Sequence, residues 1–166
     1  MKNLLTIFVL FLGLGLVNAQ EKKPTKEETI NFIERILNTS HNMNGPVSEF
    51  KINDNTLLYR VFDDSFLDQK VEYYGIYFEK INSVTIDPIN YSNNNTRIKI
   101  NFDYNGIRKS VKTKWFIEGL EDANHSEDNL NIISLAVPKI KAESIIKAFE
   151  RLKEIAKEEN KDPFAE

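Results

Sequence analysis

The sequence predicts a single α+β domain of about seven antiparallel strands, with an N-terminal helix and a C-terminal amphipathic helix. Three observations carry this prediction. Helical periodicity is confined to the two ends, short Ile-, Val-, Phe- and Tyr-rich segments fill the middle, and too little chain separates these segments for parallel crossovers. The chain has 166 residues, a formal net charge of −3 and no cysteine. Disulfides, thiolate metal sites and thiol catalysis are therefore excluded.

The first 19 residues have the three parts of a cleavable export signal. Lys2 supplies the positive start, an apolar run extends from Leu4 to Val17, and Val17-Asn18-Ala19 places small residues at the −3 and −1 positions of a cleavage site. A membrane-spanning helix needs about 20 apolar residues, and this run is shorter. We expect an exported protein, periplasmic or extracellular, with no transmembrane segment after signal removal.

The domain organisation follows in order along the chain. We expect a signal peptide at 1–19, a leader at 20–24, a single α+β domain at 25–160 and a flexible tail at 161–166. The N-terminal helix begins with a capping box, in which Thr25 caps the first turn and Glu28 reaches back to it, and it ends near Asn38. The sequence leaves open whether this helix packs on the rest of the domain.

The strands and the second helix are predicted from their periods. The candidate strands are 47–53, 56–62, 70–79, 83–87, 96–104, 107–117 and 130–137. After Pro138 a helix runs to about Glu158, and its apolar stripe consists of Ile145, Phe149, Leu152 and Ala156. We expect that stripe to close the core.

Asn105-Gly106 predicts a two-residue hairpin between the segments 96–104 and 107–117, because this dipeptide suits the type I′ turn. The implied register places Arg97 opposite Lys114 and Lys99 opposite Lys112. Like charges directly across from each other destabilise a sheet. The five basic residues on this face are a candidate anion-binding strip: Arg97, Lys99, Arg108, Lys112 and Lys114.

Two interpretations of this strip stay open. In the first, the cations are tolerated because a neighbouring strand supplies carboxylates or because the long Lys side chains extend into water. In the second, the strip contacts an anionic partner. In an exported protein that partner is an anionic lipid, an acidic polysaccharide or an acidic protein surface, and no nucleic acid is expected. We therefore expect a non-enzymatic binding or interaction module.

Catalytic and metal-binding patterns are weak by comparison. His41 and His125 both fall in polar segments, and a small periplasmic hydrolase using one of them is an alternative, as is a carrier for an apolar ligand. A histidine within hydrogen-bond reach of a carboxylate inside a pocket would favour the enzyme. The run Asp122, Asn124, Ser126, Asp128 alternates like a calcium loop but lacks its glycine and final glutamate, so we expect a solvated acidic loop. No catalytic residue, metal or cofactor is predicted.

A resemblance supplements these patterns. Seven strands followed by one amphipathic helix resemble the element order of pleckstrin-homology-like (PH-like) barrels over about 47–158. The signal ending Val-Asn-Ala, the segment Ala148-Phe149-Glu150-Arg151-Leu152 and the tail Lys161-Asp162-Pro163-Phe164 resemble small exported proteins of the Gram-negative envelope. The resemblance implies a binding scaffold, either a barrel or a strongly bent sheet.

Overall fold

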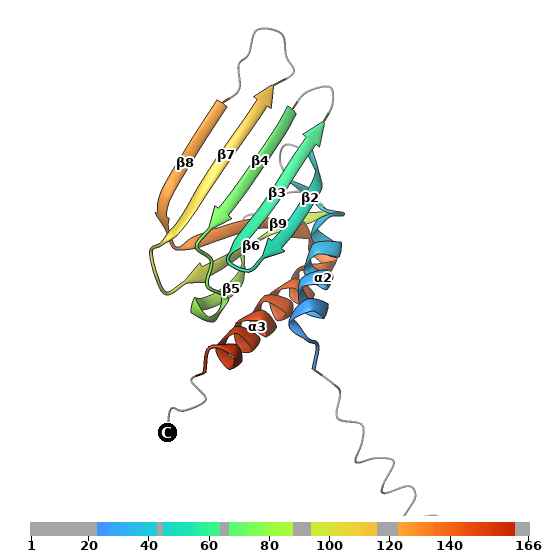
Figure 1. Ribbon diagram of the computed structural model, residues 1–166. Coiled ribbons are helices and arrows are strands. Elements are labelled where there is room, and N and C mark those ends of the chain that lie inside the picture. Colours follow the sequence, from blue (N-terminus) through green and yellow to red (C-terminus); the bar gives the residue numbers. More distant parts are fainter. Residues whose placement is uncertain (1–22, 43–44, 64–66, 88–93, 116–122, 162–166) are drawn as a thin grey trace, which may run out of the picture.

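A computed structural model describes residues 23–42, 45–63, 67–87, 94–115 and 123–161. The chain forms two antiparallel sheets and two main helices, so the predicted α+β class is confirmed (Figure 1). The expected signal peptide lies outside the described residues, as do most of the leader and of the tail. No helix in the described part of the chain is both long and apolar enough to cross a membrane.

The larger sheet has six strands in the order β1-β2-β3-β4-β7-β8. Their bounds are β1 His41–Asn42, β2 Gly45–Asn53, β3 Thr56–Asp63, β4 Leu67–Tyr74, β7 Ile107–Trp115 and β8 Ala123–Leu130. Strands β2 and β3 are joined by the two residues Asp54 and Asn55, with Asp54 at φ 27°. The strand β8 was not predicted. Its residues fall largely in the segment that we expected to be a solvated acidic loop, and they pair with β7 instead.

The smaller sheet has three strands in the order β5-β6-β9. Its strands are β5 Ile81–Asp87, β6 Asn95–Phe102 and β9 Ile132–Pro138, and the short 3₁₀ helix η1 Phe78–Lys80 precedes β5. Side chains alternate along β6 between buried and half-buried, which places one face of this strand in the core. The strand pairings do not close the two sheets into a barrel.

The helices complete the core. Helix α2, Lys26–Leu37, has the predicted capping box of Thr25 and Glu28, and α3 spans Ala142–Glu159 after the 3₁₀ helix η2, Lys139–Lys141. Helix α3 contacts η1, β5 and α2 (Figure 1). All four residues of its predicted stripe are buried, with Phe149 fully so. Both sheets and both helices contribute to one hydrophobic core.

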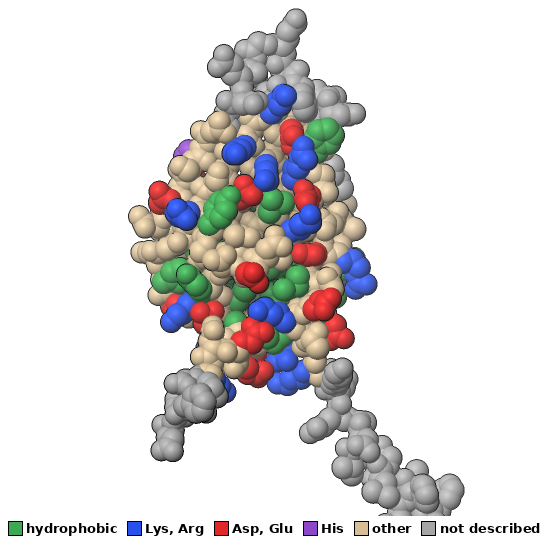
Figure 2. Space-filling model, in the orientation of Figure 1, with side chains coloured by type: hydrophobic (Ala, Val, Ile, Leu, Met, Phe, Trp, Pro, Cys, Tyr) green, Lys and Arg blue, Asp and Glu red, His purple; other side chains and the backbone are tan. Residues whose placement is uncertain are grey.

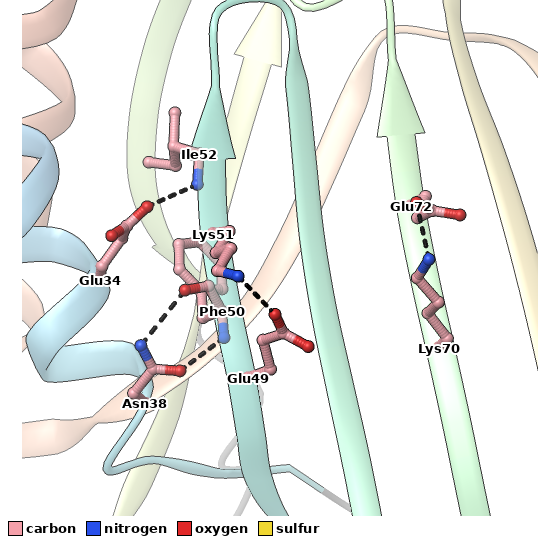
Figure 3. Close-up of polar contacts among 8 residues, drawn as sticks. All are labelled: Glu34, Asn38, Glu49, Phe50, Lys51, Ile52, Lys70 and Glu72. Carbon is pink, nitrogen blue, oxygen red and sulfur yellow. Dashed lines mark hydrogen bonds and ion pairs between the residues drawn. The ribbon is translucent and has the colours of Figure 1, made fainter.

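Helix α2 is attached to β2 by helix side chains that form hydrogen bonds with the backbone of the strand (Figure 3). Strand β1 pairs with β2 only at Gly45 and Pro46. Beyond that point the Asn38 side chain both donates to the Phe50 carbonyl and accepts from the Phe50 N–H. A carboxylate oxygen of Glu34 accepts from the Ile52 N–H at 2.8 Å. The question that the sequence left open is answered, since α2 packs on the domain and satisfies part of a strand edge.

The predicted hairpin at Asn105-Gly106 is wrong. Strand β6 pairs with β5 and β9, whereas β7 pairs with β4 and β8, so the two segments belong to different sheets. A type I′ turn needs positive φ at both central residues, and neither Asn105 nor Gly106 has it. The alternation that we used is equally compatible with any partner strand, so it could not identify the correct one.

The segment between β6 and β7 instead crosses from one sheet to the other and is held by backbone contacts. The Tyr104 hydroxyl donates to the Gly75 carbonyl and accepts from the Tyr77 N–H, and the Asp103 N–H donates to the Lys80 carbonyl at 3.0 Å. Gly75 has φ +73°, and a Cβ there would lie 3.0 Å from the Gly106 carbonyl oxygen. The glycine therefore allows this close approach.

Candidate functional site

The outer face of the larger sheet carries a group of basic side chains over β3, β4 and β7. Figure 2 shows Lys and Arg side chains gathered over the upper ends of these strands, with fewer Asp and Glu among them. A shallow cavity of about 440 Å³ lies here. We define the cationic face by the charged and amide side chains that line it: Arg60, Lys70, Lys112, Lys114, Glu49, Asp68 and Asn124.

Strand register places three of these cations in one row. Arg60 lies opposite Lys70, and Lys70 lies opposite Lys112, each as a direct cross-strand partner. Glu49 precedes the row on β2, and Asn124 follows it on β8. Like charges directly opposite each other destabilise an antiparallel pair. The arrangement is therefore not one that sheet stability alone would favour.

Carboxylates compensate two of the three cations. The Arg60 guanidinium forms a two-bond ion pair with Asp68, with Nε donating to Oδ1 at 2.7 Å. This pairing holds the pKa of Asp68 below its ordinary value, and Lys114 acts in the same direction. The Lys70 ammonium lies 3.1 Å from Glu72. Lys112 is exposed and makes no ion pair with any residue that the structure describes.

The structure divides the predicted strip between the two sheets. Arg108, Lys112 and Lys114 lie on β7 and point to the outer face of the larger sheet, whereas Arg97 and Lys99 lie on β6. On β6 the Lys99 ammonium lies 3.1 Å from the buried carboxylate of Asp87, which is also the strand partner of Arg97. A neighbouring strand thus supplies a carboxylate to this half of the strip. Anion binding by the other half remains a prediction.

Sequence reasoning missed Arg60 and Lys70 as members of this face. Both lie in predicted strands or at their ends, at alternating positions that face away from the core. The alternation placed them on an outer surface, but only the pairing of β4 with β7 brings them beside Lys112. The signal that could have found them is the order of the strands, which local patterns do not contain.

The two histidines are placed differently from each other. His125 lies on β8, and its ring nitrogen Nε2 is 3.0 Å from Glu127, which also binds Lys109 at 3.2 Å. The hydrogen bond from His125, followed by that from Lys109, lowers the pKa of Glu127. The side chains of His125 and Glu127 are 64% and 39% exposed, so a pocket does not enclose the pair. His41 lies on β1, and its side chain is outside the described residues.

The remaining candidate residues that the structure describes are either exposed or packed into the fold. Asn124, Ser126 and Asp128 are exposed along β8, and Asp122 is not described. Within the described ranges no group of three or more acidic or histidine side chains could hold a metal ion. Tyr73 is buried, and this burial raises the pKa of its hydroxyl. Tyr74 lies on the opposite face of the same strand, as the alternation of side chains along a strand requires.

Comparisons with known proteins add no relative. No family model, no curated protein and no solved structure matches this chain. The resemblances to PH-like barrels and to exported envelope proteins therefore remain predictions.

Proposed function

We propose that this protein is an exported, non-enzymatic binding module that holds an extended polyanion on the cationic face. The single observation that carries the proposal is the row Arg60, Lys70 and Lys112, in which like charges face each other across neighbouring strands. An anionic partner relieves this repulsion, because its negative groups lie between the cations. The free protein keeps the row in place through the carboxylates of Asp68 and Glu72.

An acidic polysaccharide fits this face better than a lipid surface does. Neighbouring strands lie about 4.8 Å apart, so the row presents a cation at regular intervals across the sheet. A linear chain with repeated carboxylate or sulfate groups matches such a row. Peripheral membrane binding relies on apolar side chains that enter the headgroup region. Among the described residues of this face, the large exposed apolar side chain is Phe62, and the Arg60 guanidinium lies over its ring, 5.5 Å from the ring centre.

The alternatives have less support. A hydrolase would depend on the pair of His125 and Glu127, which lies exposed on the edge strand β8. A carrier for an apolar ligand would need an internal cavity, whereas large buried side chains of both sheets and both helices pack into the core. Export rests on the pattern of residues 1–19, and it places the protein where acidic polysaccharides occur.

The test compares polyanion binding by two charge-matched double variants. Lys112→Glu with Lys114→Glu reverses two cations of the cationic face. Lys157→Glu with Lys161→Glu reverses two exposed cations at the end of α3. Retention on immobilised heparin, a sulfated polysaccharide, is measured at low and moderate salt, and circular dichroism checks that each variant is folded.

We expect the first variant to bind about tenfold more weakly, since each lost contact between exposed charges is worth roughly 0.5–1 kcal/mol. The second variant should bind as the parent does, and raising the salt should weaken binding by the parent. Equal retention of both variants would overturn the proposal. Binding of the parent to phosphatidylglycerol vesicles but not to heparin would reassign the face to lipid.

A further inference from the structure

A second surface feature lies away from the cationic face, in a groove between the two helices. The start of α2 lies beside the end of α3, since the Lys26 ammonium is 2.6 Å from the Glu159 carboxylate. Arg151, from the middle of α3, donates to the carbonyl of Pro24, which lies just before α2, at 3.1 Å. The groove has a volume of about 840 Å³ and is lined mainly by apolar surface. None of the residues that line it belongs to the cationic face.

Each helix lines the groove with one of its faces. Helix α2 contributes Thr29 and the set Glu28, Asn31, Phe32 and Arg35, and helix α3 contributes the set Ser144, Lys147, Ala148 and Arg151. Both sets have the spacing i, i+3, i+4, i+7, which is one face of a helix over two turns. Two such helix faces side by side form a surface onto which a third helix packs.

The charges in the groove are unevenly distributed. At the end near Pro24, Glu28 and Arg151 carry opposite charges. Toward the other end the ionisable lining residues are the cations Lys147 and Arg35, and the Arg35 guanidinium lies 5.9 Å from the centre of the Phe32 ring. Phe32 and Ala148 form the apolar centre, with Ala148 buried and Phe32 half-buried. The short side chain of Ala148 leaves room beside the ring of Phe32.

We propose that this groove docks a short amphipathic helix of a partner protein, with an apolar stripe at its centre and carboxylates toward its C-terminal end. The lining residues of α2 extend from Glu28 to Arg35, a rise of about 10 Å, so two to three turns of helix cover them. An apolar side chain of the partner inserts over Ala148 against Phe32. Its carboxylates, together with the negative end of its helix dipole, lie beside Arg35 and Lys147.

A helix fits this groove better than a single acyl chain. Sites for small apolar ligands enclose most of the ligand surface, whereas this groove lies open between two helices. A helix of three turns is marginal in water and folds as it binds, which lowers its affinity. We therefore expect a dissociation constant on the order of micromolar rather than nanomolar.

The experiment uses a fluorescent synthetic peptide of about 12 residues. It carries Leu at i, i+3, i+4 and i+7 and Glu in its last turn. A second peptide has Lys in place of Glu, and a third has a central Pro that prevents a helix. Anisotropy titrations compare the parent protein with the double variant Arg35→Glu and Lys147→Glu. The single variant Lys157→Glu, on the same helix but outside the groove, is the control.

We expect the Glu peptide to bind the parent and the control equally, and the double variant about tenfold more weakly. The Lys peptide should show the reverse preference and bind the double variant best, which also shows that this variant is folded. Absence of binding, equal binding of the Glu and Lys peptides, or undiminished binding of the Pro peptide would overturn the proposal. The variant Lys112→Glu with Lys114→Glu should retain peptide binding, so this test is independent of the polyanion proposal.

Discussion

Lys99 and Lys112 illustrate how one residue type has opposite roles in the two sheets. Lys99 lies beside the carboxylate of Asp87, whose side chain is 2% exposed, whereas Lys112 is exposed opposite Lys70. Lys99→Glu should lower the free energy of unfolding by about 1–3 kcal/mol, because a buried carboxylate then faces a like charge. Lys112→Glu should leave it unchanged or raise it slightly, because it removes a cross-strand repulsion. Urea denaturation of both variants measures the difference, and equal destabilisation would contradict the assignment.

The pair of Arg60 and Asp68 predicts a pH dependence of stability. Its hydrogen bonds hold the pKa of Asp68 below its ordinary value. A carboxyl group with a lowered folded pKa stabilises the fold above its unfolded pKa, which is about 3.9, and this contribution is lost as the pH falls through the folded value. Asp68→Asn should therefore flatten the decline of unfolding free energy below about pH 5. Glu158→Gln, which changes an exposed carboxylate without a described ion pair, should leave the decline as in the parent.

At the scale of elements, the attachment of α2 to β2 depends on Asn38, whose side chain forms the hydrogen bonds that a neighbouring strand would form. Its side chain pairs with both backbone groups of Phe50 on the edge of β2 away from β3, at a position that the described pairing with β1 does not reach. Asn38→Ala should lower the free energy of unfolding by about 1–2 kcal/mol, because two backbone groups lose their partners. Asn31→Ala on the same helix should have no effect or a small stabilising one, since Ala is the better helix former. Equal denaturation midpoints for the two variants would show that the bonds do not anchor the helix.

Elements with a strong local signal were predicted from the sequence, and those defined by partners were not. The capping box of Thr25 and Glu28 and the buried stripe around Phe149 were correct because helix signals lie within a few residues. Strand β8 was missed because an edge strand with the sequence of residues 123–130 buries little apolar surface and has no clear alternation. The pairing of β6 was wrong because the segment at Asn105 and Gly106 is held by contacts with Gly75, which is distant in sequence.

At the scale of the whole molecule, the candidate site could be predicted only in part, because it too depends on which strands are neighbours. Lys112 and Lys114 were identified as unusual, but the row that includes Lys70 and Arg60 exists only because β3, β4 and β7 are neighbours. The order and register of the strands decide which charges lie opposite each other, so this arrangement follows from tertiary structure rather than from composition. The two proposed surfaces are correspondingly separate, one on the outer face of a sheet and one between helices.

Export is the prediction that sets the environment for both surfaces. Cleavage after Ala19 would leave the capping box at Thr25 intact, since the leader 20–24 separates them, and Arg151 would still hold the Pro24 carbonyl. Expression of the full chain in a Gram-negative bacterium should therefore yield a folded periplasmic protein that begins at Gln20. N-terminal sequencing and the intact mass of the periplasmic fraction measure this directly. Ala19→Arg should block cleavage, because the −1 position requires a small residue. A cytoplasmic product that retains Met1 to Ala19 would contradict export and remove the extracellular polyanion as the partner.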